Sequence, residues 1–152
     1  MKVCIMRHGE AGFSASSDSS RTLTNYGIIQ SNQAGIWLKQ QNYQFDFGLV
    51  SPYLRAQQTL TELSSHVRVD KVETNRFLVP SGSPSHIVDV LTLLLADGIE
   101  NVIVVSHLPL VGYLVNELCP QVSPPMFPTA AIACINLLPE SAGKLEWFYQ
   151  AE

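Results

Sequence analysis

Charged side chains are scarce in this 152-residue chain, and clusters of one charge sign are missing. Lys, Arg, Asp and Glu make up 14% of the residues and apolar residues 46%, a balance that argues against disorder and favours a well-filled core. The net charge of −4 is mild, and no Lys/Arg cluster accompanies it. We therefore expect neither a nucleic acid nor a membrane as a partner.

Paired cysteines and long apolar runs are also missing. Cys4, Cys119 and Cys134 are odd in number and widely spaced, without a C-x-x-C or zinc pattern, so we expect buried, reduced thiols. The first residues lack the apolar core of a secretory signal, and the most apolar segment, 87–95, is too short to span a bilayer. These features predict a cytoplasmic protein with a single domain over residues 1–152.

Strand-like and helix-like segments alternate along the chain, which predicts an α/β fold with a mostly parallel central sheet and helices on both faces. Strands are predicted at 2–6, 48–50, 68–73, 101–105, 132–138 and 145–149. Helices are predicted at about 25–41, 52–65, 84–97 and 109–118. The β-branched run at 102–105 indicates a central strand that is buried on both faces.

Helix start signals are sharp at three places. Ser51-Pro52 and Ser83-Pro84 each pair an N-cap hydroxyl with proline at the first helical position, and Pro109 opens the fourth helix. Arg55 lies in the first turn of the second helix and off its apolar stripe, so its guanidinium is free to face the strand ends. The serine-rich segment 12–21 predicts a loop at the rim of a site.

Residue types suited to phosphate chemistry follow three of the predicted strands. Arg7 and His8 follow the first strand, Arg55 comes soon after the second, and His107 follows the fourth. Ligands of open α/β sheets bind beyond the carboxyl ends of the strands, so we expect one pocket to hold all four side chains. A neutral imidazole has a lone pair that can attack phosphorus, and guanidinium groups hold two phosphoryl oxygens at once. We predict His8 as the nucleophile, with Arg7, Arg55 and a protonated His107 binding the phosphoryl group.

Each of these residues has an ordinary alternative when it is taken alone. His8 could be a structural histidine and Arg55 a solvated helix residue, and only their joint placement favours a site. His66 and His86 lack such a context, so both are predicted to lie on the surface. Glu10 either orients the site or caps the loop, and its sequence position leaves both open.

Four motifs follow one another along the chain: Arg7-His8-Gly9-Glu10, Leu23-Thr24-x-x-Gly27, Ser51-Pro52-x-x-Arg55-Ala56-x-x-Thr59 and Val105-Ser106-His107. In order and spacing they closely resemble the histidine phosphatase (phosphoglycerate mutase-like) superfamily over about residues 1–118. The short length and the segments 18–24, 106–113 and 124–127 resemble the small bacterial phosphohistidine phosphatases of the SixA type within it.

The resemblance implies a three-layer fold, transient phosphorylation of His8 and no metal or other cofactor. We assign substrate contacts to Gly9, Arg21 and Leu108, with Arg21 either reaching the phosphate or its carrier or pairing with Asp18. The expected substrate is a phosphohistidine-bearing protein of a signalling pathway, either a histidine phosphotransfer domain or a phosphotransferase-system protein. Two alternatives remain: a small-molecule phosphatase or phosphomutase of the same fold, and a module that binds phosphohistidine without turnover.

One departure from the superfamily bears on the mechanism. Many members carry a carboxylate general acid after the third strand, where Glu73 is the only candidate in this chain, at the last position of the predicted strand. An alkoxide leaving group would need that proton, whereas an imidazole, with a pKa of about 6.5, leaves readily without it. The missing acid therefore favours an N–P bond over a phosphate ester, and the compact chain favours an open pocket that accepts a protein.

Overall fold

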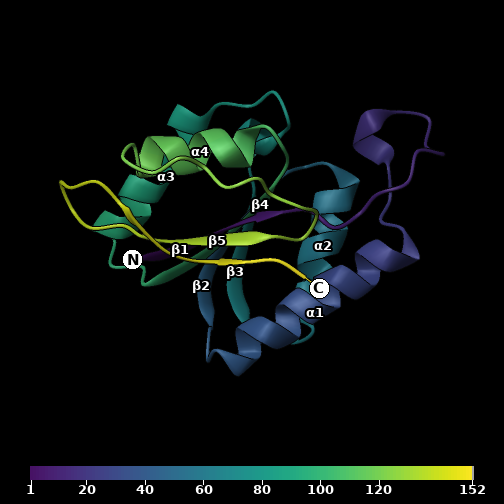
Figure 1. The fold of residues 1–152 in the computed structure, drawn as a ribbon, viewed down its shortest axis with the longest axis horizontal. Coiled ribbons are helices and arrows are strands. Elements are labelled where there is room, and N and C mark those ends of the chain that lie inside the picture. Colours follow the sequence, from purple (N-terminus) through teal and green to yellow (C-terminus); the bar gives the residue numbers. More distant parts are fainter. Residues whose placement is uncertain (152) are drawn as a thin grey trace.

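The computed structural model describes residues 1–151 and has one sheet between two layers of helices (Figure 1). The strands are β1 (Lys2–Arg7), β2 (Phe45–Val50), β3 (Val69–Thr74), β4 (Asn101–Ser106), β5 (Ile132–Asn136) and β6 (Lys144–Tyr149). They lie in the order β3-β2-β4-β1-β5-β6, with the first four parallel and the last two antiparallel to their neighbours. The predicted fold class is confirmed.

Four α-helices cover the sheet, and two short 3-10 helices lie in its connections. They are α1 (Asn25–Gln40), α2 (Leu54–Ser64), α3 (Pro84–Ala96), α4 (Leu110–Leu118), η1 (Asp18–Ser20) and η2 (Arg76–Leu78). Figure 1 shows α1 and α2 on one face and α3 and α4 on the other. One buried cluster joins the first pair to the sheet through side chains such as Leu38 and Leu63, and a second joins the other pair through Ile87 and Leu114.

The central strand is β4, as the β-branched run predicted. Its residues 102–105 are all fully buried, because helices cover both faces of the sheet at this position. The edge strand β3 is exposed over most of its length. The strand ends are less well predicted: β2 begins at Phe45 instead of Gly48, because Phe45 already pairs with Val69 of β3.

The predicted starts of two helices are wrong. Helix α2 begins at Leu54 with Tyr53 at its N-cap, so Ser51 is not the capping residue. The Ser51 hydroxyl instead accepts a hydrogen bond from the Tyr53 amide (3.2 Å) in the turn that leaves β2. Pro109 is the N-cap of α4 and not its first helical residue, which is Leu110. Both turns follow the carboxyl ends of strands, β2 and β4.

Other local predictions are confirmed. Ser83 caps α3 by accepting from the His86 amide, and Pro84 is the first helical residue. The three cysteines are buried free thiols. Within residues 1–151, no helix has both the length and the apolar character that crossing a bilayer requires.

Candidate active site

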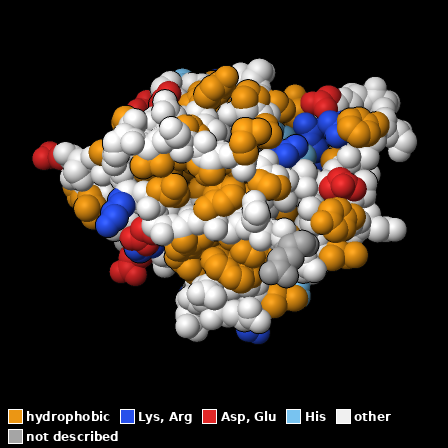
Figure 2. All heavy atoms as spheres, in the orientation of Figure 1, with side chains coloured by type: hydrophobic (Ala, Val, Ile, Leu, Met, Phe, Trp, Pro, Cys, Tyr) orange, Lys and Arg blue, Asp and Glu red, His pale blue; other side chains and the backbone are white. Residues whose placement is uncertain are grey.

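The carboxyl ends of β1 and β4 lie side by side in register, with Arg7 opposite Ser106. His8 and His107 directly follow these strands, and their rings lie 5.0 Å apart between centroids. A pocket of about 420 Å³ opens beside His8 and is lined by Arg7, Arg21 and parts of the 10–13 segment. Arg55 and His107 contact His8 and are not among its lining residues, so the pocket holds two of the four predicted side chains. In Figure 2, blue and pale-blue side chains lie in a hollow on the visible face, with orange side chains on either side.

His8 is held in one orientation by its own backbone neighbour. Its side chain is only 6% exposed, and Nδ1 lies 2.7 Å from the carbonyl oxygen of Gly9. A carbonyl only accepts, so Nδ1 carries the proton and Nε2 keeps the lone pair. The Gly9 amide in turn donates to the Thr59 hydroxyl (3.0 Å), which fixes the segment to α2.

Gly9 occupies a position that no larger residue would fit. A Cβ atom there would lie 2.7 Å from the carbonyl oxygen of Gly27 and 2.9 Å from the Ser31 hydroxyl. The close approach of α1 therefore requires glycine next to the histidine. The structure thus places the predicted Gly9 against His8, where its carbonyl sets the tautomer.

Arg55 links the histidine to the rim loop. Its Nε–H donates to Nε2 of His8 (3.2 Å), and its two terminal nitrogens donate to the backbone oxygen (2.7 Å) and carboxylate (3.4 Å) of Asp18. The arginine is 3% exposed although it lies in the first turn of a helix. Its guanidinium therefore lies between His8 and the rim loop, where Asp18 accepts two of its hydrogen bonds.

Two buried side-chain nitrogens of the pocket have no hydrogen-bond partner among residues 1–151, Nε of Arg7 and Nδ1 of His107. Arg7 uses another nitrogen, Nη1, to donate to the carbonyl oxygen of Phe127 (3.0 Å). A buried polar group without a partner costs about 1–3 kcal/mol, so such groups are rare unless a ligand satisfies them. An anion with several acceptor oxygens would satisfy both.

Ser51 positions the second histidine. Its hydroxyl lies 2.7 Å from Nε2 of His107, and the Tyr53 ring packs edge-on against the imidazole at 5.1 Å. When the hydroxyl donates to Nε2, the single proton of the neutral ring sits on Nδ1 and is available to a ligand. The turn between β2 and α2 thus holds His107 as well as starting the helix.

The pocket disfavours additional positive charge. Burial lowers the pKa of His8 to about 4 against the opposing hydrogen bond to Gly9, and the charge of Arg55 contributes to the shift. Burial lowers the pKa of His107 to about 3, with further contributions from His8 and Arg55. Both imidazoles are therefore neutral in the free protein at pH 7. A bound phosphoryl group would reverse part of this effect, because its negative charge favours a protonated His107.

The rim loop carries Arg21, which lines the pocket without touching His8. Its Nε donates to the carbonyl of Gly12 (2.8 Å), and Nη1 forms an ion pair with Asp18 (3.1 Å). The Phe13 ring lies 4.3 Å from the guanidinium carbon. Chiefly through its hydrogen bond to Arg21, the pKa of Asp18 is lowered, so this carboxylate is charged at neutral pH.

The other predicted residues make their contacts outside the cluster of His8, Arg55 and His107. Leu108 is half-buried and packs against the core on the α3 and α4 side. Glu10 is exposed at the pocket and accepts a hydrogen bond from the Thr24 hydroxyl (2.9 Å). Glu73 lies inside β3, pairs with Lys71 (3.6 Å) and does not line this pocket.

The surface prediction is correct for His86 and wrong for His66. His86 is exposed, whereas His66 is half-buried and lies 2.6 Å from the side-chain oxygen of Asn32. Within residues 1–151, no group of three or more His, Cys, Asp and Glu side chains is arranged to hold a metal ion.

Two residues of the site were not predicted in their present roles, Ser51 and Asp18. Ser51 follows β2 directly, so its position at a strand end was an available signal that was assigned to capping instead. Asp18 was considered only as a partner of Arg21, and its contact with Arg55 crosses 37 positions of sequence. No local pattern reveals such a contact.

Residues 3–78 match the model of the histidine phosphatase superfamily (branch 1). The chain is 45% identical over 148 residues to phosphohistidine phosphatase SixA of Escherichia coli K12, covering 97% of this chain and 92% of that protein. It is 40% identical over 141 residues to a SixA homolog of Haemophilus influenzae, covering 88% and 86%. The solved structure of the protein histidine phosphatase SixA with tungstate superposes with a TM-score of 0.95 at 44% identity, covering 97% of this chain and 96% of that one.

Proposed function

The chain belongs to the histidine phosphatase superfamily, and we propose that it is a protein phosphohistidine phosphatase, a hydrolase that cleaves the N–P bond of a phosphohistidine on another protein. The observation that carries the proposal is the pair of buried, unpartnered nitrogens of Arg7 and His107 beside an imidazole whose Nε2 is unprotonated. This combination suits a group that is both electrophilic and rich in acceptor oxygens. The solved SixA structure holds tungstate, an oxyanion of related shape, which supports the same choice.

Four residues form the proposed catalytic set, His8 as nucleophile and Arg7, Arg55 and His107 as donors to the phosphoryl oxygens. In the free pocket the Nε–H of Arg55 points at the lone pair of His8, so this hydrogen bond must turn to a phosphoryl oxygen when the nucleophile attacks. Arginine suits the task because its donors are arranged as a fixed fork. We further propose that Gly9, Arg21 and Leu108 contact the substrate.

The reaction has two displacement steps. Nε2 of His8 attacks phosphorus, the bond from phosphorus to the partner's imidazole breaks, and that imidazole leaves with the electron pair and gains a proton from solvent. Water then attacks the phosphorus on Nε2 and loses a proton to solvent, which releases inorganic phosphate and restores His8. The donors need not move far between steps, because both transfer the same phosphoryl group.

The carboxylates near the pocket favour an N–P bond over an ester. Hydrogen bonds and charge from Arg21 and Arg55 lower the pKa of Asp18, Glu73 does not line the pocket, and Glu10 at the rim accepts a hydrogen bond from Thr24, so none of the three is arranged to give a proton to a leaving alkoxide. An imidazole leaving group has an ordinary pKa of about 6.5 and departs without that help. The proposed partner is a histidine phosphotransfer domain or a phosphotransferase-system protein in a signalling pathway. We place the activity in the cytoplasm, which the odd number of free thiols supports.

A turnover comparison tests the proposal. The value of kcat/KM should be higher on phosphohistidine proteins than on sugar phosphates or phosphoglycerate, which are measured with the same preparation. A higher value on the small esters would contradict the proposal and favour a small-molecule phosphatase of the same fold. Binding of phosphohistidine protein without release of phosphate would favour a non-catalytic binding module.

A further inference from the structure

We propose that the exposed side chains of Phe13 and Met126 form a docking surface for the protein segment that carries the phosphohistidine, an inference that rests on the proposed function. Both side chains are 85% exposed, more than any other large apolar side chain within residues 1–151. Exposed apolar groups gathered at a pocket are a mark of binding surfaces, because covering them is favourable.

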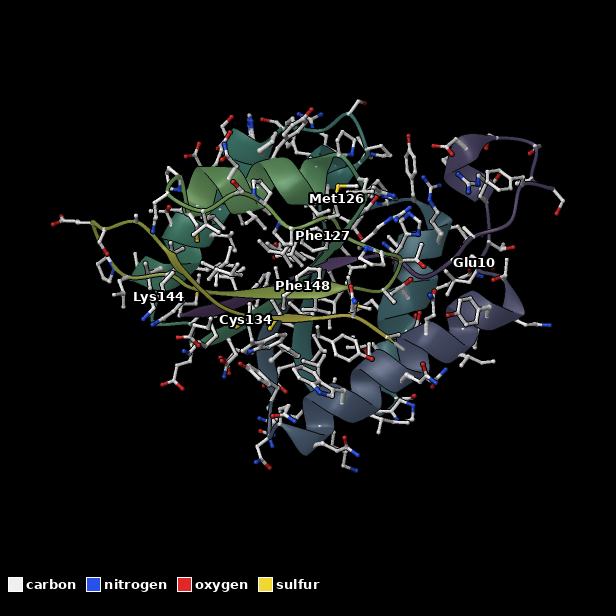
Figure 3. All side chains as sticks on the ribbon, viewed as in Figure 1. Glu10, Met126, Phe127, Cys134, Lys144 and Phe148 are labelled. Carbon is white, nitrogen blue, oxygen red and sulfur yellow. The ribbon has the colours of Figure 1, made fainter. Side chains whose placement is uncertain are left out.

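The two side chains lie on two separate segments, each of which contacts an arginine of the pocket. Phe13 lines it directly and stacks on Arg21 in the rim loop. Met126 precedes Phe127, whose carbonyl accepts the hydrogen bond from Arg7. In Figure 3, Met126 and Phe127 lie next to α4, away from the rim loop and from Glu10. The Phe13 ring thus contacts Arg21, and the residue that follows Met126 is hydrogen-bonded to Arg7.

The depth of the nucleophile explains why a protein substrate would cover these residues. His8 is 6% exposed, so a phosphohistidine has to insert its ring to bring phosphorus to Nε2. Its backbone then lies at the rim, and the residues on either side of it rest against Phe13 and Met126. A free phosphorylated amino acid could reach His8 without either contact.

Charge at the rim defines the partner further. The Asp18 carboxylate is already paired with Arg21 and Arg55, whereas Glu10 lines the pocket, is exposed and accepts a hydrogen bond from the uncharged Thr24 hydroxyl. A basic residue beside the phosphohistidine would be attracted to Glu10 and an acidic one repelled by it. The occupant is therefore a protein segment with apolar side chains near its phosphohistidine and neutral or basic residues next to it.

The experiment compares two substrates across four proteins. The wild type, Phe13→Ser, Met126→Ser and the control Leu93→Ser are assayed on a phosphorylated histidine phosphotransfer domain and on free phosphohistidine. Leu93 is a matched control because it is 67% exposed on α3 and does not line the pocket. The ratio compared is kcat/KM on the phosphorylated domain divided by kcat/KM on free phosphohistidine. Phe13→Ser and Met126→Ser should each lower this ratio on the order of tenfold, as expected for an interface contact. Met126→Ser should leave turnover of free phosphohistidine unchanged, and Leu93→Ser should leave the ratio unchanged.

The outcomes separate this inference from the proposed function. If the wild type hydrolyses the phosphoprotein but neither rim substitution changes the ratio, or Leu93→Ser changes it equally, the docking surface is overturned and the function stands. If the wild type hydrolyses small phosphate esters and no phosphohistidine protein, the proposed function fails and the docking surface with it.

Discussion

Two cavities at opposite ends of the sheet differ in size and in the atoms that line them. The larger, of about 610 Å³, lies between α3, α4 and the loop after β5, and its walls include Val88, Leu95 and Leu118. It is near the amino end of β1, because the Leu137 amide beside it donates to the Met1 carbonyl. The smaller, of about 420 Å³, is at the carboxyl end and contains Arg7 and His8.

The comparison of the two cavities indicates that the lining atoms, and not the volume, identify the one suited to bind an anion. The amino-end cavity is formed mainly by aliphatic side chains and lacks a histidine or arginine in its wall. The carboxyl-end pocket has buried donors without acceptors and an imidazole held in one tautomer. Unsatisfied buried polarity is costly in folding, so its concentration at one end of the sheet is the stronger sign of a binding site.

The largest expected difference between the two ends comes from removing a pocket donor. Arg55→Ala should lower kcat/KM on phosphohistidine protein by about 10²–10³, the usual effect of losing one strong donor to a transition state. Steady-state kinetics measures the effect, and circular dichroism establishes that the variant is folded. Activity near that of the wild type would reduce Arg55 to a structural residue.

A second prediction concerns how the free energy of unfolding depends on pH, because His8 is neutral in the folded protein. Because the pKa of His8 is about 4 in the folded protein and about 6.5 when unfolded, the unfolded chain binds more protons between these values. Stability is therefore full above about pH 6.5 and is lost as the pH falls toward 4. The loss from pH 7 to pH 5 should be about 2 kcal/mol for this histidine.

Urea unfolding at the two pH values measures this loss in the wild type and in His8→Asn. The variant should lose about 2 kcal/mol less than the wild type over the same interval. Equal losses in the two proteins would show that His8 titrates alike in the folded and unfolded states.

A smaller effect is expected from Asp18 at the rim, where a substitution should strengthen anion binding instead of weakening activity. Asp18 competes with any bound anion for Arg55 and Arg21, so Asp18→Asn should bind tungstate roughly two- to fivefold more tightly, the range of an exposed ion pair. Asp70→Asn is the control, since Asp70 is a partly exposed aspartate that pairs with Arg68 on the edge strand. Isothermal titration calorimetry measures both affinities. Weaker tungstate binding by Asp18→Asn would mean that the carboxylate positions the arginines and does not compete.

The smallest effect is expected at the amino end. Ala96 lines the apolar cavity at the end of α3, and Ala96→Phe should fill part of it without changing kcat/KM by more than about twofold. The same steady-state assay measures it. A large change in kcat/KM would show that the apolar cavity influences the reaction at the other end of the sheet, which would contradict the separation of the two sites.

The sequence predicted the elements that are defined by repeated patterns. The buried run at 102–105 and the proline start of α3 were enough to place β4 and α3, because periodicity and capping are local properties. The placement of His8 and His107 next to each other followed from the position of strand ends in an open sheet. These inferences needed no knowledge of side-chain contacts.

The parts that the sequence did not predict depend on long-range contacts. Arg7 is held by the backbone oxygen of Phe127, and a carbonyl leaves no trace in the identity of its residue. Ser51 has the sequence signature of a helix cap but holds His107, 56 positions away. The contact between Asp18 and Arg55 likewise depends on how an irregular loop folds over α2. Local sequence patterns predict contacts between residues that are close in the sequence, whereas these three contacts join residues that are far apart in it.

Intact mass of the protein, quenched with alkali during turnover of a phosphohistidine protein, tests the central claim most directly. Alkaline conditions preserve an N–P bond that acid would hydrolyse. The account predicts a fraction of the wild type that is heavier by one phosphoryl group, with the group on His8 and absent from His8→Ala. Turnover without such a species, or the same species in His8→Ala, would contradict the role of His8 as the nucleophile.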